Sequence, residues 1–69
     1  MKVIVIGGCF PQAINKIGKV IKYDYDPKRT DYARDVYWVE FENIVFEGTD
    51  PETQHPNRAY FFGPEVMIL

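Results

Sequence analysis

A strict alternation of side chains over residues 35–42 (DVYWVEFE) constrains the fold of this chain more than any other feature. Successive side chains of a β-strand point to opposite faces, so Tyr37, Val39 and Phe41 share one face. The other face carries Val36, Trp38, Glu40 and Glu42. We therefore expect a half-buried strand that places Tyr37, Val39 and Phe41 in a core and turns Trp38 outward.

Short runs of β-branched and aromatic residues predict the other strands. These runs are residues 2–6, 17–24, 44–47, 58–62 and 66–69. Loops rich in Gly, Pro and polar residues separate them, and Gly63-Pro64-Glu65 predicts one 3₁₀ turn before the last strand. Residues 10–17 have room for one helical turn, and no segment keeps a helical period over ten residues. The pattern predicts a single all-β domain over residues 1–69, a small barrel of five or six short antiparallel strands.

The same alternation predicts a core of eleven side chains. They are Val3, Val5, Ile17, Val20, Tyr37, Val39, Phe41, Phe46, Phe61, Val66 and Ile68. Gly18, near the start of the second predicted strand, indicates either a β-bulge or a close approach of two backbones.

Composition excludes several classes of protein. Hydrophobic residues make up 46% of the 69 residues, which is too apolar for a disordered segment. One cysteine, Cys9, excludes an internal disulfide and a Cys-rich zinc site. We find no apolar run of membrane-spanning length and no signal-peptide pattern, so we expect a cytoplasmic protein.

Catalytic and metal sites are not indicated. Cys9 follows two glycines, but a nucleophilic cysteine needs a base and an oxyanion donor, and the single histidine, His55, falls in the predicted loop over residues 48–57. A lone histidine does not hold a metal ion, and no other ligands have a recognisable spacing. We therefore expect no enzymatic activity, no metal and no cofactor.

The first two predicted strands resemble the KOW-type start of SH3-like barrels. In that pattern a strand and a loop lead to a glycine that opens the next strand as G-x-V-x-x-[VI]-D. Gly18, Val20, Tyr23 and Asp24 occupy these places. The resemblance implies a small SH3-like barrel, and KOW-type barrels often bind RNA.

The order of elements along the whole chain is also similar to that of the small SH3-like subunit of photosystem I and of related ferredoxin-docking barrels. The similar elements are Lys2-Val3, Asn15-x-Ile17-Gly18-x-Val20, Val39-x-Phe41-Glu42, Phe46-x-Gly48 and Asn57…Phe61…Glu65-Val66. These families are non-enzymatic subunits that help ferredoxin or a neighbouring subunit to bind. Their docking bases do not map clearly here, since the third predicted strand has Glu40 where a base is expected after the central valine.

An outward-facing Trp38 is the main candidate for partner contact, because tryptophan is enriched at interface hot spots. The alternative is that one of the loops at residues 25–34 and 48–57 covers it. The predicted contact surface comprises Trp38, Val36, Glu40, Tyr25, Tyr32 and Arg29. This favours a protein-binding module that serves as accessory subunit, inhibitor or regulator of a larger enzyme or complex. The small acidic chain would also suit a phage-encoded regulator.

Nucleic-acid binding is the alternative function. Residues 1–34 contain seven basic and three acidic residues, whereas residues 35–69 contain one basic and seven acidic residues. The basic half predicts an RNA or DNA surface made by Lys16, Lys19, Lys22 and Lys28. The net charge of −2 argues against it, because nucleic-acid-binding domains are usually strongly basic.

Overall fold

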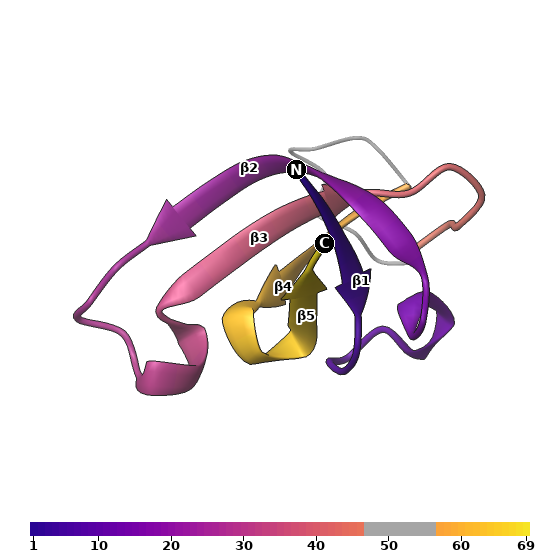
Figure 1. Ribbon diagram of the computed structural model, residues 1–69. Helices are drawn as coiled ribbons and strands as arrows, with labels where there is room; N and C mark the ends of the chain where they lie inside the picture. Colours follow the sequence, from indigo (N-terminus) through magenta and orange to yellow (C-terminus); the bar gives the residue numbers. More distant parts are fainter. Residues whose placement is uncertain (47–56) are drawn as a thin grey trace.

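The computed structural model describes residues 1–46 and 57–69, which form five strands and three 3₁₀ turns (Figure 1). The strands are β1 (Lys2–Val5), β2 (Ile17–Tyr25), β3 (Asp35–Glu40), β4 (Arg58–Phe62) and β5 (Val66–Ile68). The turns are η1 (Pro11–Ala13), η2 (Asp31–Ala33) and η3 (Gly63–Glu65). The predicted all-β class is confirmed, as is the 3₁₀ turn directly before the last strand.

All five strands belong to one antiparallel sheet with the order β4-β3-β2-β1-β5. The long strand β2 pairs first with β1 and then with β3, and its register with β3 shifts between Val20 and Lys22. Such a bulge increases the bend and twist of a strand. The sheet therefore curls, and β2 and β3 arch over β4 and β5 as in a small, partly open barrel (Figure 1).

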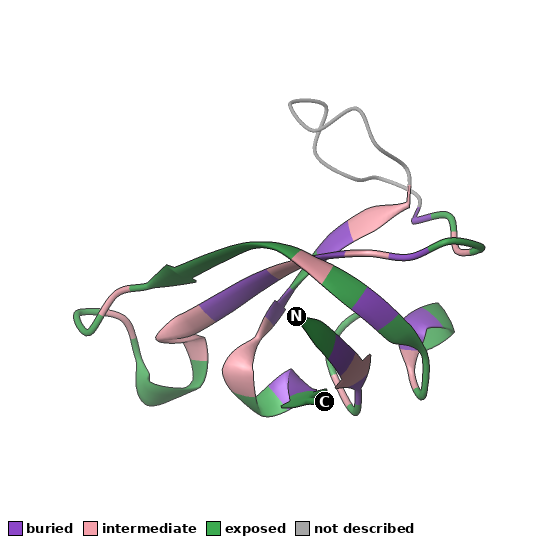
Figure 2. Ribbon diagram, turned by 45° about the horizontal axis from the view of Figure 1, so that its top comes forward, coloured by how far each residue is buried: buried purple, intermediate pink, exposed green. Residues whose placement is uncertain are grey.

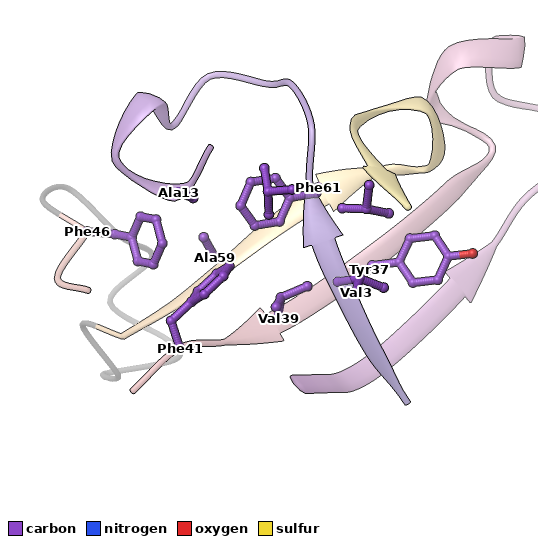
Figure 3. Packing of buried hydrophobic residues seen from close by; sticks show 10 residues of the cluster. Val3, Ala13, Tyr37, Val39, Phe41, Phe46, Ala59 and Phe61 are labelled. Atoms are coloured by element: carbon purple, nitrogen blue, oxygen red, sulfur yellow. The ribbon is translucent and has the colours of Figure 1, made fainter. Parts of the chain in front are cut away.

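The core lies on the concave face of this sheet, as the alternation in β3 predicts (Figures 2 and 3). Tyr37, Val39 and Phe41 are buried there. So are five other predicted core residues: Val3, Val5, Phe46, Phe61 and Val66. Val20 is half-buried and packs against the cluster, and Ala13 and Ala59 join it unpredicted.

Two predicted core residues are wrong: Ile17 and Ile68 are 57% and 55% exposed. Ile17 pairs with Ile4 and shares the outer face, because the next residue, Gly18, is the one that points inward. Ile68 lies opposite Val3 on the last strand of the sheet, where no further described strand covers it.

At Gly18 the backbone of β2 lies very close to Val39, Glu40 and Phe41. A Cβ atom added there would lie 2.3 Å from Val39 Cγ1 and 2.8 Å from Phe41 Cε1. Contacts of real Cβ atoms are essentially never this short, so only glycine fits under β3 at this point. The predicted close approach is confirmed, while the bulge lies further along β2, beyond Val20.

The predicted strand at residues 44–47 is wrong as far as it is described, because residues 44–46 have no strand pairing. Phe46 is nevertheless buried, since its ring packs 5.1 Å from Phe10 and 5.5 Å from Phe41. Glu47 and the predicted loop residues 48–56 lie outside the described residues.

Candidate protein-binding surface

Four aromatic rings follow one another on the outer face of the sheet, opposite the core. The ring centroids of Trp38 and Tyr60 are 6.2 Å apart, those of Tyr60 and Phe62 are 5.9 Å apart, and those of Phe62 and Tyr32 are 5.8 Å apart. We call this row of Trp38, Tyr60, Phe62 and Tyr32 the aromatic strip. It runs from the middle of β3 along β4 to the η2 hairpin.

Strand register builds most of the strip. Trp38 is paired with Tyr60, and Val36 with Phe62, so alternation places their side chains on the outer face. Tyr60 and Tyr32 are 49% and 50% exposed, and Trp38 and Phe62 are half-buried. The predicted outward position of Trp38 agrees with this placement, and one side of its ring is covered by Lys22, whose Nζ lies 4.9 Å from the ring centroid.

A buried carboxylate holds the Tyr32 end of the strip. Glu65, only 7% exposed, accepts a hydrogen bond at Oε1 from the Phe62 N–H (2.9 Å) and one at Oε2 from the Tyr32 hydroxyl (3.0 Å). The hydrogen bond to Glu65, followed by burial, raises the pKa of Tyr32. Gly8, with φ +110°, makes room for this carboxylate, which an added Cβ would meet at 3.1 Å. Glu65 thereby fixes the η2 hairpin to the end of β4.

Two ion pairs flank the strip. Arg58 Nε donates to Glu40 Oε2 at 2.8 Å, and Arg29 Nη2 donates to Asp24 Oδ2 at 3.2 Å. These side chains are partly exposed, so each pair contributes at most about 1 kcal/mol to stability. Arg58 is the neighbour of Ala59 on β4 and shares the outer face with Tyr60, and a guanidinium that makes one such bond keeps further N–H donors.

Four of the six predicted contact residues lie at or beside the strip: Trp38, Tyr32, Glu40 and Arg29. Val36 is a correction, because it is 4% exposed and is not available as an exposed contact. It lies between Asp24 and Phe62 in the sheet register, and these two neighbours are contacted by Arg29 and Tyr32 of the hairpin.

Tyr25 does not join the strip. It is 54% exposed, but it pairs with Asp35 on the opposite face of the sheet. Sequence reasoning also missed two members of the strip, Tyr60 and Phe62. The alternation within RAYFF holds that signal, because an inward Phe61 turns both of its neighbours outward.

The structure brings two of the four lysines predicted to bind nucleic acid, Lys16 and Lys19, to one groove. Lys16 and Lys19 line an open groove of about 560 Å³ together with Lys2, but Glu40 and Glu42 line it as well. Lys22 instead lies over Trp38, and Lys28 belongs to the hairpin after β2. The groove therefore carries both signs of charge.

A second cluster of tyrosines lies on the concave side near the end of β2. The Tyr23 hydroxyl donates a hydrogen bond to Asp35 Oδ1, and this bond, with burial, raises the pKa of Tyr23 to about 12. Burial raises the pKa of the neighbouring Tyr37, whose ring lies 4.9 Å from that of Tyr23. These contacts join β2 to β3.

The described residues contain no group of three or more His, Cys, Asp or Glu side chains placed to hold a metal ion. Cys9 is exposed, and the single histidine, His55, lies outside the described residues. No helix within residues 1–46 and 57–69 is long and apolar enough to cross a membrane.

Comparison with protein-family models, with curated proteins and with solved structures finds no match for this chain. The kinship with KOW-type and ferredoxin-docking barrels therefore stays a prediction from the residues. We base the function proposed below on the geometry of the aromatic strip.

Proposed function

We propose that this protein is a small non-enzymatic binding module that acts as an accessory subunit, inhibitor or regulator of a larger enzyme or complex. It contacts its partner through the aromatic strip. The observation that supports this proposal is a row of four rings on the outer face, two of them about half exposed, none of which belongs to the core cluster of the described residues.

Burial of this strip by a partner would be favourable for two reasons. Transfer of apolar surface from water contributes roughly 25 cal/mol per Å², and Trp and Tyr residues dominate interface hot spots. The rings are also held in place before binding. Trp38 and Tyr60 face each other across β3 and β4, and Glu65 binds the Tyr32 hydroxyl and the Phe62 backbone. Little side-chain entropy is then lost on association.

Capture of partners from a lysate of the source cells tests the proposal. The immobilised protein is compared with Trp38→Ala and with Tyr25→Ala, a control that removes an exposed ring from the opposite face. A hot-spot residue contributes about 2 kcal/mol or more, so Trp38→Ala should reduce capture of specific partners at least about 30-fold. Tyr25→Ala should capture them normally. Equal capture by wild type and Trp38→Ala would contradict the proposal.

Nucleic-acid binding is the second candidate, and it is supported by the three lysines that meet at the groove. A mobility shift of RNA or DNA at low salt, weakened by Lys16→Ala and Lys19→Ala and falling steeply with salt, would favour it. The two glutamates in the same groove make it the weaker proposal.

We also propose kinship with small SH3-like barrels and a cytoplasmic location. The five-strand order and the 3₁₀ turn before β5 support the kinship. Ferredoxin docking is the narrower form of this proposal. Binding of purified ferredoxin that depends on Trp38 would support it, and absence of binding would remove it.

A further inference from the structure

We infer that the partner contributes an extended segment that adds as a sixth strand to the outer edge of β4, beside the aromatic strip. This inference rests on the proposed function and specifies the kind of partner. It follows from the hydrogen-bonding direction of β4 and from the side chains that line its edge.

The backbone of β4 bonds to β3 through alternate residues. Phe41 N–H donates to Asn57 O at 2.9 Å, and the register continues through Val39 with Ala59 and Tyr37 with Phe61. In an antiparallel pair the intervening residues turn their N–H and C=O groups the other way. Arg58, Tyr60 and Phe62 therefore direct these groups away from β3, and the bond from the Phe62 N–H to Glu65 Oε1 agrees with this.

No hydrogen bond between the described residues uses the N–H groups of Arg58 and Tyr60, which point to where a new strand would lie. Among the described residues β4 is the last strand on this side of the sheet, and none pairs with its outer edge. An unpaired strand edge is a template for another strand. The Glu65 carboxylate ends the available edge at Phe62, so the site accommodates about five residues.

The opposite edge, β5, is a poorer template. It has three residues, and the outward N–H of Val66 already donates to Gly63 O. Only Ile68 then has both backbone groups directed outward, since Leu69 N–H donates back to Lys2 O. The aromatic strip also lies along β4 and not along β5.

The side chains beside the β4 edge specify the chemistry of the added segment. On the outer face a new strand would place alternate residues opposite Phe62, Tyr60 and Arg58. Apolar side chains fit opposite the two rings. A carboxylate fits opposite Arg58. The Nε–H of this side chain donates to Glu40, and the other four N–H groups of a guanidinium can donate to a second carboxylate. Every strand pair of this sheet is antiparallel, so the predicted order is apolar-x-apolar-x-acidic.

Selection from a random twelve-residue peptide library against the immobilised protein tests this inference. We expect enriched peptides to share the apolar-x-apolar-x-acidic pattern. Their binding should slow amide hydrogen exchange of Tyr60 and Arg58 at least tenfold. Enrichment of proline-rich or helical amphipathic sequences, no enrichment, or unchanged exchange at Tyr60 would overturn it.

Two substitutions of Tyr60 distinguish the contribution of its backbone N–H to binding from the contribution of its ring. Tyr60→Ala and Tyr60→Pro both remove the ring, but only proline removes the outward N–H, which makes no bond to β3. We expect Tyr60→Pro to bind the selected peptide about tenfold more weakly than Tyr60→Ala. Equal binding by two folded variants would overturn strand addition, while loss of partner capture by Trp38→Ala would still support the binding module. If Tyr60→Pro does not fold, the exchange measurement decides.

Discussion

Replacement of Gly18 by alanine tests the close packing of β2 against the core residues Val39 and Phe41. The added Cβ would lie 2.3 Å from Val39 Cγ1, 2.8 Å from Phe41 Cε1 and 3.0 Å from the Glu40 carbonyl oxygen. The first two atoms belong to fully buried side chains, and the third belongs to the backbone of β3. None is the far end of a flexible side chain, so β2 and β3 must separate to admit the methyl group.

Overpacking of a core costs about 1–3 kcal/mol, and the backbone contact places Gly18→Ala near about 3 kcal/mol. The stability of a chain of this size is only on the order of 3–10 kcal/mol. For so small a domain each kcal/mol lowers the melting temperature by roughly 4–8 °C, so a fall of about 12–24 °C is expected.

Thermal unfolding followed by circular dichroism measures this effect, with Gly7→Ala as the matched control. A Cβ at Gly7 meets no atom within 4 Å. We expect Gly7→Ala to melt within about 3 °C of wild type, as surface substitutions usually do. If Gly18→Ala also melted within about 3 °C of wild type, the close contact between β2 and β3 would be wrong.

Two further predictions concern groups that hold the strip and the tyrosine cluster. Glu65→Ala leaves the Phe62 N–H and the Tyr32 hydroxyl without their acceptor and should cost about 2 kcal/mol in urea unfolding. Tyr32→Phe keeps the ring and one of the two hydrogen bonds and should cost less than half as much; the reverse order would contradict the role given to Glu65. The second prediction follows from the hydrogen bond to Asp35, which raises the pKa of Tyr23 from 10.0 to about 12. A raised pKa stabilises the folded state below the unfolded value, so this contribution is present below pH 10 and is lost between about pH 10 and 12. Tyrosine absorbance should show a group titrating near pH 12 that Tyr23→Phe removes; complete titration of all tyrosines near pH 10 would refute it.

The alternation of β3 was enough to predict the class of fold and the centre of the core. Tyr37, Val39 and Phe41 are inside because a half-buried strand has a period of two. The same rule failed at the start of β2, where Ile17 was predicted to be buried. Glycine has no side chain to signal its direction, and the packing of Gly18 under Val39 decides which neighbour turns outward.

The binding surface was harder to predict because it depends on register between distant strands. Trp38 was identified from its own strand, but its contact with Tyr60 follows from the pairing of β3 with β4, which lie far apart in the sequence. Val36 shares the outer face with Trp38 and is buried all the same. Its two cross-strand neighbours, Asp24 and Phe62, are contacted by Arg29 and Tyr32 of the hairpin, and alternation within one strand does not contain such tertiary contacts.

Nuclear magnetic resonance of the ¹⁵N-labelled protein, titrated with a captured partner, tests the role of the aromatic strip most directly. The indole N–H of Trp38 is a single resolvable probe, because the chain has one tryptophan. We predict large shifts of this signal and of the Tyr60, Phe62 and Tyr32 amides. Shifts confined to Lys16, Lys19 and their groove, with the Trp38 indole unchanged, would contradict it.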